Sequence, residues 1–160
     1  MADEGYGEDD PTMRLYLDSA DQKEWEKWAE TGLFYGFTTN PTIFKRDGVQ
    51  CTLHAVRQLV RHAFDLEIEE LQLQAWGLTW SDIYSTGLDL YEMDQRIVVK
   101  VPMTGPGVRA AYRLLQDDVP VTLTGAFSSH QAVTAMAMGV DYLAPYLGRM
   151  NDAGKDVGLG

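Results

Sequence analysis

Residues 96–102 read RIVVKVP, a run of apolar β-branched residues that is interrupted by one lysine. Apolar residues at consecutive positions are typical of a strand buried on both faces, as in a parallel sheet that helices cover. Lys100 follows Val99 directly, so its amine is expected in a place that excludes most water. The stretch therefore predicts a parallel α/β sheet with a lysine in an unusually apolar setting.

Similar short apolar runs recur along the chain, and stretches with helical spacing separate them. One such stretch, CTLHAVRQLVRHAFD, places its apolar residues on one helical stripe. Strands that alternate with helices predict parallel βα units, which build either a closed (β/α)8 barrel or an open doubly wound sheet. We expect strands within residues 13–20, 35–41, 70–76, 96–102, 119–127 and 141–149, and helices within 21–31, 51–65, 81–93, 107–116 and 128–138.

The composition limits the kinds of partner. The chain has 160 residues, of which 45% are hydrophobic, which suits one domain with a real core. A formal net charge of -11 makes nucleic acid a poor partner, and no apolar run approaches the ~20 residues that span a bilayer. The single cysteine, Cys51, excludes an internal disulfide, and a reducing, cytoplasmic compartment fits this best.

The two ends differ in composition from the segment between them. Residues 1–12 carry five acids and no base, which predicts a disordered acidic leader and argues against a signal peptide. Residues 151–160 are Gly-rich and polar and predict a loop-like tail. We therefore expect one domain over residues 13–150.

Polar side chains stand at the predicted carboxyl ends of the strands, where ligands bind in both architectures. Lys100 is the sharpest signal, because burial favours the neutral amine that Schiff-base chemistry needs. The alternative is a lysine that reaches water or pairs with an acid. Asp18 suits either a general base or a cap for the helix at 21–31. The scattered His54, His62 and His130 predict no metal site.

Several of the other polar residues also have two interpretations. Thr39 and Asn40, in the sequence TTNP, offer hydrogen bonds to a polyol, but the same sequence favours a turn. Gln74 stands between apolar neighbours, where a lone amide is more often structural than catalytic. Tyr146 can simply pack with its hydroxyl at the surface.

Taken together, the motifs resemble one family. LYLDSA (15–20), GFTTNPT (36–42), IVVKVP (97–102), VTLTGAFS (121–128) and APYLGR (144–149) occur in an order that is similar to the transaldolase family. The resemblance is to its small fructose-6-phosphate aldolase-like branch, and it runs from about residue 13 to residue 150. It implies a TIM-type barrel, cofactor-free chemistry on a sugar phosphate, and a homo-oligomer.

The resemblance also assigns roles by matching position. Lys100 would form the Schiff base, and Asp18 would transfer protons. Gln74 and Thr124 would hold the catalytic water, and Tyr146 would take part in proton transfer. The substrate contacts would come from Asn40 and from Arg149, whose guanidinium suits a phosphate.

Two residues distinguish branches within the family. Gln74 and Tyr146 are similar to the aldolase branch, which releases dihydroxyacetone from fructose 6-phosphate. Transaldolases proper, which transfer the three-carbon unit to erythrose 4-phosphate in the pentose phosphate pathway, usually have Glu and Phe there. Trp76 departs from the branch pattern, in which smaller residues are usual, so the pocket wall is expected to differ.

Length and one further motif leave other readings open. A barrel has eight strands and takes about 250 residues, or about 200 when small. Six strands are expected here, so we expect about three quarters of a barrel, truncated after about six βα units. Such a chain could be a catalytically incompetent fragment or be completed by another copy.

GPGVRA (105–110) also matches a dinucleotide fingerprint formally, although Pro106 stiffens the turn and no ribose-binding acid follows.

Overall fold

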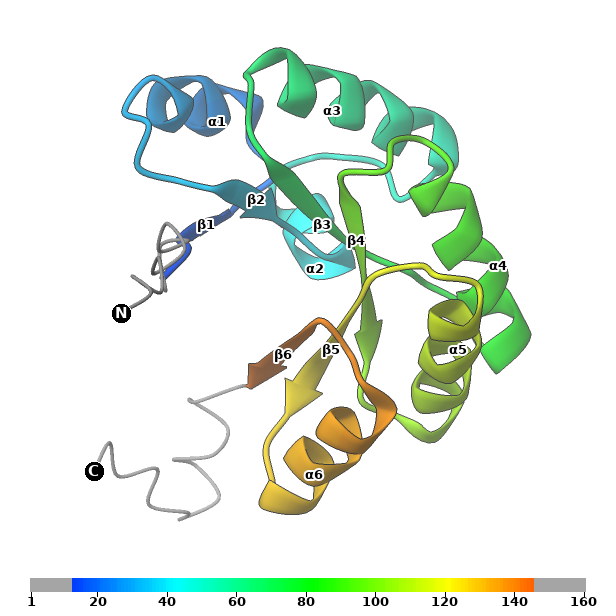
Figure 1. Cartoon of the computed structure of the whole chain (residues 1–160). Coiled ribbons are helices and arrows are strands. Elements are labelled where there is room, and N and C mark those ends of the chain that lie inside the picture. The colour runs from blue at the N-terminus through cyan, green and yellow to red at the C-terminus, as the bar shows by residue number, and fades with distance from the viewer. Residues whose placement is uncertain (1–12, 146–160) are drawn as a thin grey trace, which may run out of the picture.

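The structure, a computed structural model, describes residues 13–145 (Figure 1). Tyr146, Arg149 and the predicted leader and tail lie outside the described residues. In chain order the elements are β1 (Tyr16–Asp18), α1 (Gln22–Ala29), β2 (Gly36–Thr38), α2 (Pro41–Arg46), α3 (Leu53–Asp65), β3 (Glu70–Gln74), α4 (Trp80–Tyr91), β4 (Ile97–Pro102), α5 (Gly105–Gln116), β5 (Val121–Ala126), α6 (Ser129–Met138) and β6 (Tyr142–Pro145).

The six strands form one parallel sheet in the order β1-β2-β3-β4-β5-β6. A doubly wound sheet would instead reverse its strand order at a switch point. The sheet is strongly curved, and the helices lie on its convex side (Figure 1). The predicted barrel type is thereby confirmed: these residues form six consecutive strands of the (β/α)8 pattern.

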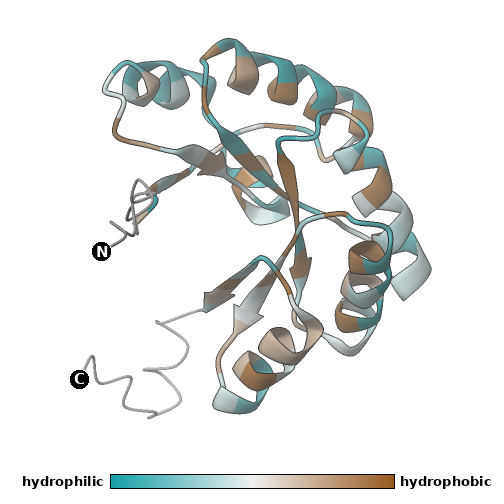
Figure 2. Cartoon of the chain, in the orientation of Figure 1, coloured by the Kyte–Doolittle hydropathy of each residue, from teal (hydrophilic) through white to brown (hydrophobic). Residues whose placement is uncertain are grey.

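Alternation along the strands separates an apolar outer face from a polar interior. Leu71, Leu73 and Val99 are at most 1% exposed and belong to the core beneath the helices. Figure 2 shows the apolar residues of β4 and the apolar stripes of α3 and α5 that form this layer. The residues between them on the strands, such as Gln72 and Lys100, face the concave side and are mostly polar. The core therefore lies between sheet and helices, and the interior is free for chemistry.

The helix starts differ from the sequence expectations in two places. Asp21 caps α1, accepting a hydrogen bond from the Lys23 amide at 2.9 Å, so Asp18 is not needed as a cap. The predicted turn at TTNP leads directly into α2, because Pro41 fits the first turn of a helix and Asn40 caps it. Both differences leave Asp18 and Asn40 at strand ends that face the interior.

The GPGVRA segment has a packing role in the structure. Thr104 caps α5, and a Cβ on Gly107 would lie 1.9 Å from the Pro102 carbonyl oxygen. Only glycine allows the helix to start so close to the end of β4. None of the helices within residues 13–145 is both long and apolar enough to cross a bilayer.

Candidate active site

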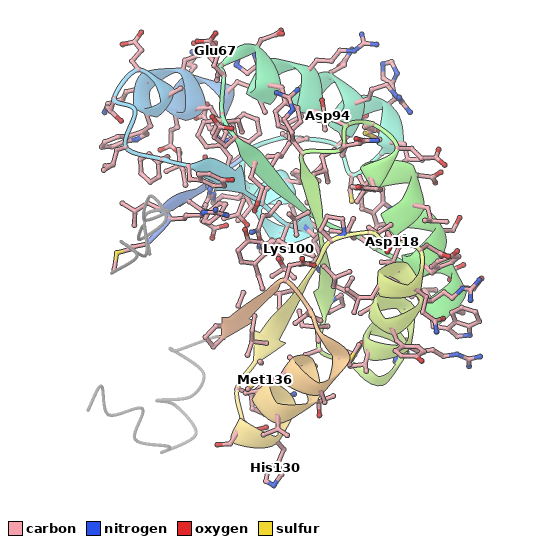
Figure 3. The ribbon with its side chains drawn as sticks, viewed as in Figure 1. Glu67, Asp94, Lys100, Asp118, His130 and Met136 are labelled. Atoms are coloured by element: carbon pink, nitrogen blue, oxygen red, sulfur yellow. The ribbon has the colours of Figure 1, made fainter. Side chains whose placement is uncertain are left out.

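Lys100 is on β4 and lies inside the curve of the sheet, on its concave side (Figure 3). It is 6% exposed, and its Nζ donates a hydrogen bond to Thr38 Oγ1 at 2.7 Å. Because β3 lies between β4 and β2, the lysine side chain crosses β3 to reach this partner. Burial lowers the pKa of the Lys100 amine, and the charge of Asp18 raises it again in part. The arrangement favours a neutral, oriented amine.

A cavity of about 380 Å³ surrounds this amine. Asp18, at the end of β1, is exposed and lines the cavity together with Asn40 and Thr124. The full lining also includes Tyr16, Thr38, Gln72, Lys100, Thr122, Tyr142, Leu143, Ala144 and Pro145. All six strands thus contribute to one wall, which is what a barrel interior makes possible.

The two threonines of TTNP face opposite ways. Thr38 lines the cavity, whereas Thr39 is 0% exposed and its hydroxyl has no hydrogen-bond partner within residues 13–145. Strand alternation explains this, since consecutive residues point to opposite faces. Thr38, and not Thr39, is therefore the threonine of TTNP that lines the cavity, and the substrate contact of Thr39 stays a prediction.

Asn40 is held by the helix that it caps. Its Oδ1 accepts from the Ile43 amide at 3.0 Å, so the oxygen is committed to α2. The Nδ2 group remains as a donor on the residue that lines the cavity. Asn40 can thus orient an acceptor oxygen of a ligand.

The two residues predicted to hold the catalytic water lie differently with respect to the cavity. Thr124 is 4% exposed and lines the cavity. Gln74 pairs in register with Lys100 but is half-buried and is not part of the cavity wall. Cys51 is exposed and does not line this cavity. Among the residues that line the cavity, Lys100 is the one that carries an amine.

The sequence did not predict a partly buried polar network around Glu70. Gln72 Nε2 donates to Glu70 Oε1 at 2.8 Å, and Tyr142 donates to Glu70 Oε2 at 2.9 Å. Tyr16 in turn donates to the Tyr142 hydroxyl at 3.3 Å, and burial raises the pKa of Tyr16. Counting back two residues from Asp18 and from Gln74 would have found Tyr16 and Gln72, because alternation places them on the same face.

Comparisons with known proteins identify the family of this chain. Residues 15–158 match the family model described as Transaldolase/Fructose-6-phosphate aldolase. A probable transaldolase of Clostridium kluyveri is 30% identical over 90% of this chain and 65% of its own length. A probable transaldolase of Aquifex aeolicus is 31% identical over 88% of this chain and 62% of its own length. The chain thus spans less than two thirds of the length of these relatives.

Solved structures show the same fold at low identity. The carboxyl transferase domain of Rhizobium etli pyruvate carboxylase, solved with 3-bromopyruvate, has a TM-score of 0.58 at 14% identity, over 92% of this chain and 32% of that one. The 2-keto 3-deoxygluconate aldolase of Picrophilus torridus has a TM-score of 0.53 at 12% identity, over 81% of this chain and 53% of that one. These likenesses support the barrel architecture alone. The match to the family model shows the family itself. The chain belongs to the transaldolase/fructose-6-phosphate aldolase family.

Proposed function

We propose that this protein is a lysine-dependent aldolase that cleaves fructose 6-phosphate and releases dihydroxyacetone. The observation that carries the proposal is the Lys100 amine, which is buried, hydrogen-bonded to Thr38 and has a lowered pKa in a polar cavity. A neutral amine attacks the C2 carbonyl, and loss of water leaves an iminium at that carbon. This chemistry needs no cofactor.

The iminium then accepts the electrons of the C3–C4 bond. Asp18, which lines the cavity near the mouth, takes the proton of the C4 hydroxyl as that bond breaks. The aldose phosphate leaves, and the three-carbon enamine remains on Lys100. Protonation of its carbon and attack by water return the free amine and release dihydroxyacetone. Asn40 orients the substrate, and Thr124 and Gln74 hold the water in this proposal.

The remaining roles fall on residues beyond the described range. Tyr146 would assist the proton transfers, and Arg149 would bind the phosphate group. Cytoplasmic location and assembly into homo-oligomers belong to the same proposal. The whole activity is proposed for a chain that spans 65% of the Clostridium kluyveri relative.

A second candidate is transfer of the three-carbon unit to erythrose 4-phosphate. The names of both relatives, probable transaldolases, favour it. Gln74, in place of the glutamate usual in transaldolases proper, favours release instead. The two reactions share every step up to the enamine, so the site geometry serves both.

Borohydride reduction in the presence of fructose 6-phosphate tests the chemistry. The expected result is a reduced adduct on the peptide that contains Lys100, and its absence from a Lys100→Met variant. Lys45→Met, at an exposed residue of α2, is the matched control and should be labelled like the wild type. An unmodified Lys100 would refute the mechanism. Product analysis with and without erythrose 4-phosphate then separates release from transfer.

A further inference from the structure

An arginine lies flat on an aromatic ring on the convex side of the sheet, where α4 and α5 pack side by side (Figure 1). The guanidinium carbon of Arg109 is 4.2 Å from the centroid of the Trp80 ring. The rings of Trp80 and Tyr84 have centroids 6.5 Å apart, and Tyr112 on α5 is 56% exposed. We call these four residues the arginine–aromatic face.

Arg109 keeps hydrogen-bonding capacity that other arginines have used. Arg46, Arg96 and Arg113 each pair with an aspartate, whereas Arg109 forms no ion pair among residues 13–145. Its planar group offers several N–H donors in a fork that matches a carboxylate, and stacking on Trp80 fixes its plane in advance. Trp, Tyr and Arg are also the residue types that dominate the binding energy of interfaces. The face therefore suits a segment that carries carboxylates beside an aromatic ring.

The first twelve residues of the chain have this composition. The sequence MADEGYGEDDPT has five acids, no base and one aromatic residue, Tyr6, with acids on both sides of it. The match to the family model begins at residue 15, so the segment is an addition to the part of the chain that matches the family. Its charge is opposite to that of Arg109, and its ring can contact the exposed aromatic rings.

The arrangement of the strands determines which copy supplies this segment. The leader precedes β1, and β1 lies across the curved sheet from α4 and α5 (Figure 1). A leader that reached the face of its own chain would have to pass around α1 and α3, which cover the sheet between these elements. A second copy can present its leader directly.

We propose that the acidic leader of one copy, residues 1–12, docks on the arginine–aromatic face of a second copy. The inference goes beyond the proposed function, because none of the four residues of this face lines the cavity around Lys100. Two chains that each carry a formal net charge of -11 repel one another, and this contact sets the most acidic stretch of one against a cation of the other.

Binding of a labelled peptide tests the contact. The probe is a fluorescein-labelled peptide of residues 1–12, titrated with the full chain, and fluorescence anisotropy gives the dissociation constant. Arg109→Ala should weaken binding by about tenfold, because it removes the stacked guanidinium. Arg109→Lys should recover only part of this loss, since an ammonium keeps the charge but not the planar fork. Binding should also weaken as the salt concentration rises.

Arg57→Ala is the matched control, because Arg57 is also an exposed arginine but lies on α3. It should leave the dissociation constant unchanged. A Tyr6→Ala peptide keeps all five acids and should bind more weakly than the original peptide. Equal binding to wild type and to folded Arg109→Ala protein, or a loss in Arg57→Ala instead, would overturn the proposal.

A mixture of two defective chains tests whether the contact joins different copies. The leader variant keeps the face but loses its acids through Asp3→Asn, Glu4→Gln, Glu8→Gln, Asp9→Asn and Asp10→Asn. Arg109→Ala loses the face but keeps the leader, so the two variants can bind each other once. The weight-average mass of an equimolar mixture in sedimentation velocity should exceed that of either variant alone at the same total concentration. A mixture with only the mean mass of its components would overturn docking between copies.

Discussion

At the scale of single residues, the chemistry depends on the balance of two effects on Lys100. Burial disfavours the ammonium form, while the Asp18 carboxylate favours it. The net effect lowers the pKa, so the folded chain binds this proton less tightly than the unfolded chain does. The contribution of Lys100 to the free energy of unfolding therefore increases as the pH rises from its folded pKa to its unfolded pKa.

This balance predicts the pH dependence of imine formation. The trapping rate should rise with pH along a titration curve. The midpoint of that curve should lie below 10.5, the ordinary lysine pKa. Asp18→Asn should move that midpoint lower, because it removes the charge that favours the ammonium. The same variant should slow cleavage of fructose 6-phosphate by ~10²–10⁴-fold through loss of the base. Rate–pH profiles of trapping and of cleavage measure both, and a midpoint that moves upward would contradict the account.

The sequence predicted Lys100, Asn40 and Thr124 as cavity residues because each stands at the end of a strand. It named Thr39 as the substrate-binding threonine of TTNP, whereas Thr38 lines the cavity, because the phase of a short strand cannot be determined when both faces are buried. Thr38 and Lys100 are 62 residues apart in sequence. Their contact depends on β2 and β4 both pairing with β3. No local pattern contains that information.

At the scale of elements, Asp47 joins the two segments that carry site residues. It follows α2, and its Oδ2 accepts from the Ala20 amide, after β1, at 2.9 Å. Arg46 binds the same carboxylate and lowers its pKa. The contact holds the end of β1, with Asp18, against the helix that Asn40 caps.

We expect Asp47→Ala to cost about 1 kcal/mol of stability and to slow cleavage through movement of Asp18. Asp94→Ala is the matched control, because Asp94 also pairs with an arginine and a backbone amide but precedes β4, at the opposite end of the strands. It should cost similar stability without slowing cleavage. Asp47→Asn keeps an acceptor and should restore activity. Denaturant melts and steady-state kinetics measure these effects, and equal kinetic losses in both alanine variants would argue against the assignment.

The alternation of strands and helices was predicted, but one short helix was not. Strands and helices alternate as the apolar pattern predicted, but α2 was expected to be a turn. The reason is that Asn-Pro favours a turn and a helix start alike, and only the Asn40 hydrogen bond to Ile43 decides between them.

At the scale of the whole molecule, hydrogen bonds across the interior connect the first and last described strands. Tyr16 on β1 and Arg14 before it donate to the Tyr142 hydroxyl on β6, at 3.3 and 3.2 Å. The rings of Tyr16 and Tyr142 also meet edge to face, with centroids 6.2 Å apart. The sequence predicted six strands and their barrel order, but not this link, which depends on the curvature of the sheet.

A double-mutant cycle on Tyr16→Phe and Tyr142→Phe should measure this link. We expect a coupling energy of about 0.5–1.5 kcal/mol, because the hydroxyls share one network with Glu70. Tyr84→Phe, which removes the bond to Asp117 on the outer surface, should be additive with Tyr142→Phe. Chemical unfolding of the four proteins in each cycle provides the values, and zero coupling in the first cycle would show that the link does not stabilise the curved sheet.

The strands that carry Lys100 and Asp18 differ in how many neighbouring strands they pair with. Lys100 is on β4, which has a neighbouring strand on either side, whereas Asp18 is on β1, which has three residues and pairs only with β2 among the described strands. Fraying in mild urea should therefore begin at β1 and separate the acid from the amine while the helix-covered middle persists. The rate of cleavage should then fall at a lower urea concentration than the far-ultraviolet circular dichroism signal does.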